Sequence, residues 1–193
     1  MKKIKKIDNF FNNYLNNITK SLLKVNKTKL NKAADEILKT IKRKGTIFVC
    51  GNGGSAAISN HYICDFLKYL RQKTSLKPKI ISLSNNIETL TAISNDLDYR
   101  YVFSYQAESL CEKNDLILII SSSGNSKNIL EILKFSKKNK IKTIGFSGFS
   151  GGKLRKACDI SVHVNVKNYG IAEDSHHILM HIILQYIIEF VNQ

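Results

Sequence analysis

Histidines and carboxylates recur at intervals of four residues in two separate parts of the chain. His61 precedes Asp65 by four positions, and Glu173, His177 and His181 repeat at the same interval near the C-terminus. Residues four apart share one face of an α-helix, so each set would present its side chains together. Imidazoles and carboxylates held in this way are the usual groups for moving protons to and from a substrate. The alternative interpretation is a helix start followed by an exposed histidine stripe.

Two polar loops, each following an apolar run, are the second chemical feature. The first, "GNGGS" at 51–55, has glycines that let a ligand approach the backbone closely. The second, "SSSGNS" at 121–126, combines four hydroxyls with backbone N–H groups at the start of an expected helix. That combination binds anions without lysine or magnesium, and it suits a phosphate monoester better than a nucleotide triphosphate. Either loop alone could be a tight turn with a helix cap, but the two together are more specific.

The elements that must position these loops alternate along the chain. Continuous apolar runs, typical of strands buried on both faces of a parallel sheet, occur at 46–50, 79–83, 116–121, 142–146 and 160–164. Segments with helical spacing lie at 55–71, 86–96, 101–112, 126–139 and 173–191. We therefore expect an α/β fold, a three-layer sandwich around a five-stranded parallel sheet.

The N-terminal region, 7–44, is expected to form two amphipathic helices that end at Gly45. No strand precedes these helices, so we expect them to pack against another subunit. The length of 193 residues suits one domain, and we predict a single domain over 1–193 with an oligomerisation region at 1–45.

The net charge of +15 suggests nucleic-acid binding at first sight, but the distribution of lysines argues against it. Lysine far outnumbers arginine, and the lysines are spread along the chain without interleaved aromatics. We predict a solvated basic surface and no nucleic-acid partner. The sequence has no run long enough to span a membrane and no signal peptide, so we expect a cytoplasmic protein. The four cysteines form no CxxC pair, which favours reduced thiols.

Four segments, "GNGGSAA", "TAISNDLDY", "ISSSGNS" and "GFSGGKL", resemble in order and spacing the sugar isomerase (SIS) fold. The resemblance is specifically to the sedoheptulose-7-phosphate isomerases, also called phosphoheptose isomerases, and it covers about 40–190. It implies a parallel sheet flanked by helices and a homotetramer with active sites at subunit interfaces. It also implies conversion of sedoheptulose 7-phosphate to D-glycero-D-manno-heptose 7-phosphate through an enediol, for surface glycans such as lipopolysaccharide or capsule.

The resemblance further implies roles for particular residues. The phosphate would be held by the hydroxyls of Ser121, Ser122, Ser123 and Ser126. The positions that contact or surround the sugar are Asn52, Gly53, Ser55 and Asp96. The catalytic acid–base positions of the family correspond to Asp65 and His181, and its zinc ligands correspond to His61, Asp65, Glu173 and His181.

Two of these positions differ from the family pattern. Asp65 replaces a glutamate and is shorter by one C–C bond, roughly 1.3 Å of reach. Either the backbone moves closer, or Asp65 is chiefly a metal ligand and another group takes the proton. Glu173 replaces a glutamine, adds negative charge and offers a substitute base, with Asp174 as its rival because the register is open by one residue. We expect His61, Asp65, Glu173 and His181 to bind zinc, with His181 and one carboxylate moving protons.

Two other functions remain open from the sequence. The chain could be a non-catalytic SIS module that binds a phosphosugar or a protein, but such a module has no need to keep acid–base residues on both helices. It could also isomerise a different phosphosugar, because the phosphate loop contacts only one end of the substrate. The segment 66–76 departs most from the family; its basic and aromatic side chains either shape substrate contacts or form a solvated helix end, which we favour.

Overall fold

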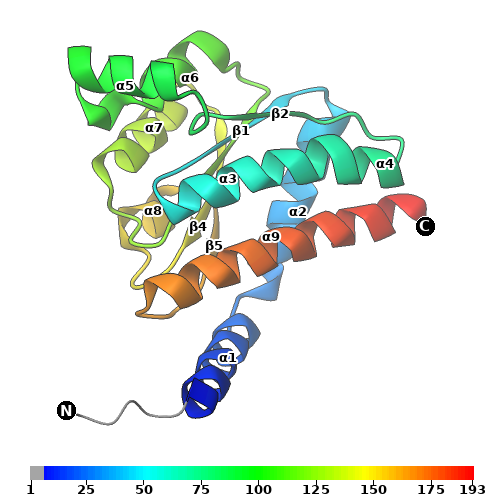
Figure 1. The fold of residues 1–193 in the computed structure, drawn as a ribbon. Helices are drawn as coiled ribbons and strands as arrows, with labels where there is room; N and C mark the ends of the chain where they lie inside the picture. Colours follow the sequence, from blue (N-terminus) through cyan, green and yellow to red (C-terminus); the bar gives the residue numbers. More distant parts are fainter. Residues whose placement is uncertain (1–6) are drawn as a thin grey trace, which may run out of the picture.

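The computed structural model describes residues 7–193 and contains one sheet of five parallel strands (Figure 1). The strands lie in the order β2-β1-β3-β4-β5. Their bounds are β1 Thr46–Gly51, β2 Lys79–Ser82, β3 Leu116–Ser121, β4 Lys142–Ser147 and β5 Ile160–His163. Each strand coincides within a few residues with an apolar run of the sequence, so the predicted α/β fold is confirmed.

Helices cover both faces of this sheet. Successive residues of a strand point to opposite faces, and in β1 this sends Ile47 and Val49 to one face and Phe48 and Cys50 to the other. The first face is covered by α2 (Lys27–Lys42), α3 (Gly54–Cys64) and α9 (Tyr169–Asn192). The second is covered by α5 (Ile87–Asp96), α6 (Ser104–Leu110), α7 (Lys127–Lys138) and α8 (Gly152–Ala157).

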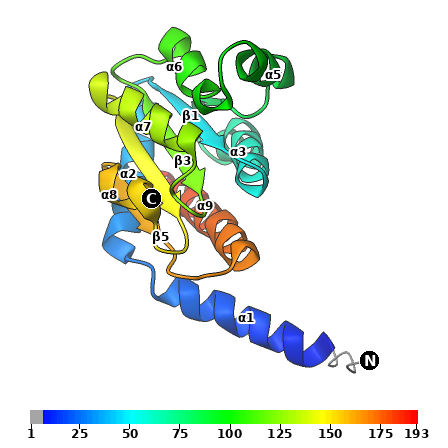
Figure 2. The same ribbon diagram turned by 90° about the vertical axis from the view of Figure 1, so that its left-hand side faces the viewer.

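The two N-terminal helices are present but differ in how they pack. α2 buries Ala33, Ile37 and other apolar residues against the sheet and α9, so it belongs to the core of this subunit. The expectation that the two N-terminal helices pack against another subunit stays a prediction, to which the structure adds that α2 also packs within its own subunit. α1 (Ile7–Leu23) buries only Ser21 among its described residues and extends away from the sheet (Figure 2).

Four further details differ from the sequence-based expectation. α9 begins at Tyr169, where Asn168 caps it by accepting a hydrogen bond from the Ile171 amide, four residues before the predicted start. α8 was not predicted at all. After α3 the chain continues as a π-helical segment, η1 (Asp65–Leu70), and then as a single turn, α4 (Arg71–Lys73). A short 3-10 turn, η2 (Tyr99–Tyr101), follows α5.

None of the helices in the described part of the chain combines the length and the apolar character needed to cross a membrane. The four cysteines are free thiols. Burial raises the pKa of the Cys50 thiol well above its usual range, so this side chain behaves as a small apolar group in the sheet.

His176 is a fully buried histidine on the face of α9 that packs against the sheet. Its ring lies edge-on to Phe146, and neither ring nitrogen has a hydrogen-bond partner among the described residues. Burial disfavours the charged imidazolium and lowers the pKa of His176 to about 4. The folded chain therefore holds this side chain neutral in mildly acidic solution.

Acid should weaken the fold through His176. Because its pKa is lower in the folded chain, the unfolded chain binds more protons as the pH falls from 6.5 toward 4, and stability falls with it. Between pH 7 and pH 5 this residue should remove about 2 kcal/mol from the free energy of unfolding. Urea unfolding at both pH values should show a smaller loss for His176→Gln than for the wild type. Ser175→Ala, at the neighbouring buried residue, removes no titratable group and should change the free energy of unfolding equally at both pH values. The assignment is contradicted if His176→Gln shows the same pH dependence as the wild type.

Candidate active site

The two polar loops lie side by side at the carboxyl ends of β1 and β3. These strands are neighbours, with Gly51 paired to Ile120. The chain passes from β1 outward to β2 and then returns to the other side of β1 as β3, so a crevice opens between the loops that follow β1 and β3. This reversal of strand order is where open α/β sheets bind their ligands.

A pair of asparagines joins the two loops across this crevice. Asn52 and Asn128 exchange hydrogen bonds, with Asn52 Nδ2 3.0 Å from Asn128 Oδ1 and Asn128 Nδ2 2.8 Å from Asn52 Oδ1. The hydroxyl of Tyr99 donates a third bond, of 2.9 Å, to Asn52 Oδ1. Asn128 and Tyr99 were not identified from the sequence, although Tyr99 ends the quoted "TAISNDLDY" segment. A reciprocal amide pair 76 residues apart leaves no sequence pattern that could reveal it.

The serine loop is held in shape by the loop that follows β4. Gly148 N–H donates to the Ser122 carbonyl, Leu154 N–H to the Gly124 carbonyl, and Lys153 N–H to Asn125 Oδ1. Gly124 has a positive φ of 65°, and a Cβ there would overlap the carbonyl oxygen of Gly151. These hydrogen bonds and the close contact at Gly124 stabilise this conformation of the loop.

The expected phosphate-binding hydroxyls gather around this fixed loop at the start of α7. Ser121 and Ser122 are buried, and the Ser122 hydroxyl has no hydrogen-bond partner among the described residues. Ser123 and Ser126 are partly exposed. An unpaired hydroxyl beside the N-terminus of a twelve-residue helix can bind an anion, since the helix dipole adds positive potential there.

The predicted sugar-binding residues divide into two groups. Gly53 (φ 54°) and the buried Ser55 lie in the turn from β1 into α3, next to Asn52. Asp96 is exposed at the end of α5, and among the described residues its carboxylate accepts a hydrogen bond only from Asn95. The structure thus brings Asn52, Gly53 and Ser55 together, whereas no hydrogen bond among the described residues joins Asp96 to them.

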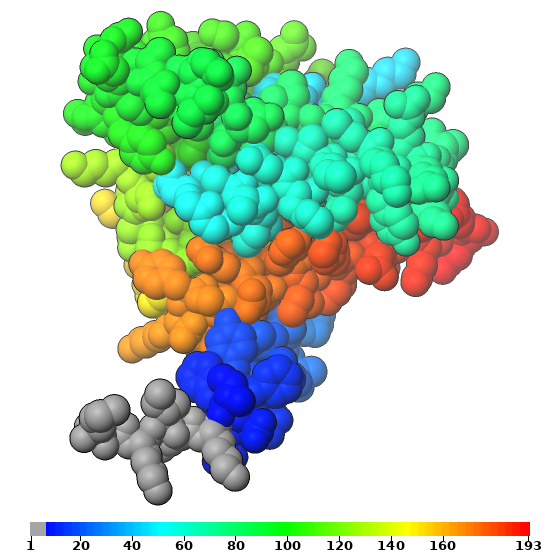
Figure 3. All heavy atoms as spheres, viewed as in Figure 1, coloured from blue at the N-terminus to red at the C-terminus, as the bar shows by residue number. Residues whose placement is uncertain are grey.

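α3 and α9 run side by side in the same direction across one face of the molecule (Figure 3). At their start, the Glu173 carboxylate lies so close to Gly54 that a Cβ at position 54 would overlap its oxygens. About two turns further along, His61 faces His181. Two sets of residues more than 100 positions apart in the chain therefore form one site, as the four-residue spacing predicted for each helix.

His61, Asp65 and His181 converge on one point between the helices. The two Nε2 atoms are 3.1 Å apart, and Asp65 Oδ2 lies 3.4 Å from His61 Nε2 and 3.1 Å from His181 Nε2. Despite its shorter side chain, Asp65 reaches both imidazoles from the first residue of the π-helical segment. A π-turn within an α-helix re-aims side chains and is frequent at functional sites.

These donor atoms fit a tetrahedral zinc ion. Zn–N distances of about 2.0–2.1 Å place neighbouring ligand atoms about 3.3 Å apart, close to the three separations between His61, Asp65 and His181. The ring of His177 lies against those of His61 and His181, with centroids 4.6 and 4.7 Å away. Burial and the two neighbouring imidazoles lower the pKa of His177, which favours the neutral, metal-binding form.

The adjacent carboxylates Glu173 and Asp174 point to different places. Glu173 faces Gly54 at the start of α3. Gly54 belongs to the sugar loop, the loop 51–55 that carries expected sugar-binding residues. Asp174 accepts a hydrogen bond of 2.7 Å from the Tyr14 hydroxyl of α1, and this bond raises the pKa of Tyr14 to about 12. Of the two, Glu173 is therefore the carboxylate that can act at the site.

Comparison with known proteins gives the same family at the level of sequence and fold. The SIS domain model matches residues 10–148. A phosphoheptose isomerase of Campylobacter concisus is 36% identical over 157 residues, 81% of this chain and 82% of that protein. One of Helicobacter hepaticus is 38% identical, covering 82% and 80%. The structure of a phosphoheptose isomerase from Francisella tularensis superposes with a TM-score of 0.88 at 25% identity, covering 98% of this chain and 100% of that one.

Disrupting the asparagine pair should weaken ligand binding in the crevice. Asn128→Ala leaves Asn52 without its reciprocal partner and should weaken binding of a sugar phosphate about tenfold, or about 1–2 kcal/mol. Tyr99→Phe removes one bond at an exposed hydroxyl and should have a smaller effect, about two- to fivefold. Isothermal titration calorimetry measures both, with Tyr105→Phe on α6 as the control. Wild-type affinity in Asn128→Ala contradicts a positioning role for the pair.

Proposed function

The chain belongs to the SIS-domain family of phosphoheptose isomerases, and we propose that it interconverts sedoheptulose 7-phosphate and D-glycero-D-manno-heptose 7-phosphate through an enediolate. The observation that carries this proposal is that a lysine-free serine loop lies beside the β1 loop, from which α3 leads to acid–base residues shared with α9. A phosphosugar isomerase needs both parts, because binding at one end of the substrate must hold the reacting carbons against proton-transferring groups at the other.

The spacing of the two parts suits a long sugar phosphate. His61 lies seven residues beyond Gly54, which is about 10 Å along a helix. Glu173 lies between the sugar loop and the imidazoles. A substrate with phosphate at one end and its carbonyl near the other can rest on the serine loop and extend along α3. The seven-carbon chain named by the family fits this separation.

The reaction moves a proton from C1 of the ketose to C2 through an enediolate. One group must remove the C1 proton and return it to C2, while another exchanges protons with the two oxygens. Asp65, Glu173 and His181 supply two carboxylates and an imidazole for these tasks. Hydrogen-bond donors around Asn52 and Ser55 orient the hydroxyls of the sugar chain.

We also propose a divalent metal, best suited to zinc, bound by His61, Asp65 and His181, with Glu173 as the ligand implied by the family. The support is the fit of the donor atoms to tetrahedral coordination. Such an ion polarises a carbonyl and stabilises negative charge on the enediolate oxygens.

The compartment and the metabolic role are proposals that follow from this chemistry. We place the enzyme in the cytoplasm, where sugar phosphates are made and consumed, and its free thiols suit that compartment. The product class suggests a supply of heptose for surface glycans. A non-catalytic role is less well supported, because a binding module has no use for a carboxylate held between two imidazoles.

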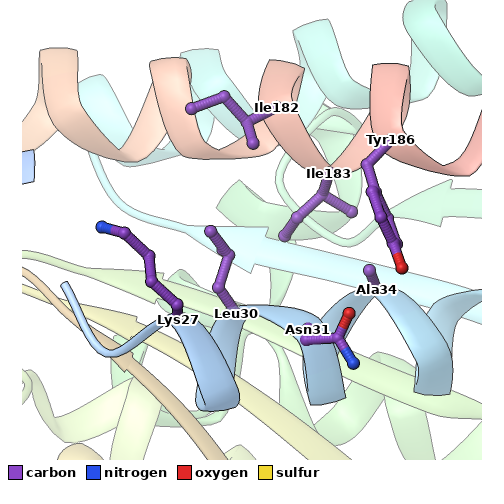
Figure 4. A pocket seen from close by; sticks show the side chains of 7 residues that line it. All are labelled: Lys27, Leu30, Asn31, Ala34, Ile182, Ile183 and Tyr186. Carbon is purple, nitrogen blue, oxygen red and sulfur yellow. The ribbon is translucent and has the colours of Figure 1, made fainter.

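We propose that the chain forms a homotetramer, as the family resemblance suggests. α1 exposes Ile7, Phe10 and Phe11, and α9 exposes an apolar stripe at Ile178, Ile182, Tyr186 and Phe190. Beside that stripe lies a groove between α2 and α9, lined chiefly by Leu30, Ala34, Ile182, Ile183 and Tyr186 (Figure 4). Apolar surface of this extent on a small protein marks a contact surface.

The proposed reaction predicts a specific isotope result. Incubation of sedoheptulose 7-phosphate in D₂O should place deuterium at C2 of the aldose, and added zinc should raise the rate. Asp65→Asn and His181→Ala should each lower turnover by a factor of about 10²–10⁴. Asp174→Asn, a carboxylate change that lies away from the imidazoles, should keep turnover within about threefold of wild type. Full activity in both active-site variants would falsify the assignment.

The proposed tetramer predicts that α1 contributes to assembly. Light scattering after size exclusion should give a mass of four chains, and Phe10→Ser with Phe11→Ser should shift it to a smaller assembly, since the change removes apolar contact area from α1. Asn12→Ser with Asn13→Ser, on the same exposed helix, serves as the control. A monomeric wild-type chain, or an unchanged mass in the phenylalanine variant, rules out this role.

A further inference from the structure

His177 is a histidine of the cluster that neither the sequence nor the family resemblance assigned to a function. It lies on α9, one helical turn before His181 and one turn after Glu173. Its ring packs edge-on against His61 and is tilted against His181. Its Nε2 atom is buried and has no hydrogen-bond partner among the described residues.

A buried imidazole nitrogen without a partner is costly unless something satisfies it. At this position the neighbours are two further imidazoles, and the ligand atoms of His61, His177 and His181 all lie within 4.8 Å of one another. A histidine that only filled space in the core would be expected to face apolar side chains or a hydrogen-bond acceptor. Three imidazoles with ligand atoms this close together are instead the donor set that zinc and similar divalent ions prefer.

Glu173 occupies a different place on the same face of α9. Its carboxylate lies against Gly54, at the first residue of α3, whereas the imidazoles surround His61 seven residues further on. Glu173 therefore lies beside the loop that follows β1, and the ring of His177 lies against the imidazoles of His61 and His181.

We propose that His177 is a metal ligand, the third imidazole beside His61 and His181, and that it takes the place expected of Glu173. Glu173 is then free to exchange a proton with the substrate beside the sugar loop. This inference rests on the proposed isomerase site, since it divides the metal-binding and proton-transfer tasks between two residues of α9.

Metal binding tests this division separately from turnover. The full chain is first stripped of metal. Co²⁺ is then titrated in and its binding is measured by visible absorption, and Zn²⁺ binding is measured by competition with a chelating dye. Loss of one imidazole ligand in His177→Ala should weaken affinity about a hundredfold or more, beyond the 10–100-fold typical of residues that only support a ligand. X-ray absorption of the zinc form should count three imidazoles in the wild type and two in the variant.

Changes at Glu173 should give the opposite pattern. The two variants are Glu173→Gln and Gly54→Ala, and the Cβ added in the second displaces the Glu173 carboxylate. Both should keep metal affinity within about threefold of wild type. Both should lower turnover about 10²–10⁴-fold at saturating metal. His163→Gln is the control, because it replaces a histidine outside the cluster. Thermal unfolding checks that each variant is folded. If His177→Ala is unfolded, His177→Gln is used in its place.

Two results overturn the proposal. The first is a wild-type metal affinity and imidazole count in the His177 variants. The second is a loss of metal affinity in Glu173→Gln as large as the loss in the His177 variants. Absence of isomerisation in the wild type with normal metal binding would instead refute the proposed function and leave the ligand assignment standing.

Discussion

The close parallel packing of α3 and α9 is the contact on which the site depends. It begins where Gly54, without a Cβ, admits the Glu173 carboxylate, and it continues to the convergence of Asp65, His61 and His181. The buried face of α3 includes small residues, and the Ser59 hydroxyl bonds within its own helix to the Ser55 carbonyl. Small residues on this face let neighbouring elements approach α3 closely, and the Ser59 hydroxyl keeps a hydrogen-bond partner within its own helix.

The packing of α3 against α9 also links the acid–base residues to the serine loop. α3 starts directly from the β1 loop, so its axis is fixed by the sheet and by the bonds between Asn52 and Asn128. Asn128 belongs to α7, which starts from the serine loop. Regular elements therefore hold both ends of the proposed substrate site, and a shift in either loop would move the imidazoles relative to the serine loop. Accurate positioning of this kind contributes to an enediolate reaction alongside electrostatic stabilisation of the developing negative charge.

The strands and both loops could be predicted because their signals are local. Buried parallel strands are continuous apolar runs, and the glycine and serine loops follow directly after two of them. The packing of α2, the bond between Tyr14 and Asp174, and the position of Asp96 could not be predicted, since each depends on contacts between distant segments. The register between Glu173 and Asp174 is a clear example: the residues are adjacent, and only the neighbouring helices distinguish them.

At Asp65, contacts between distant segments change the effect that is expected of a shorter carboxylate. Read from sequence, a shorter carboxylate at a catalytic position suggests lost reach, because a displacement of about 1 Å can slow proton transfer by roughly a hundredfold. In the structure the shorter side chain begins a π-helical segment and still places one oxygen between two imidazoles. A carboxylate held there is oriented by His61 and His181 rather than extended toward a sugar. This placement favours the second interpretation of Asp65, as a metal ligand, and it agrees with the proposal that Glu173, beside Gly54, exchanges the substrate proton.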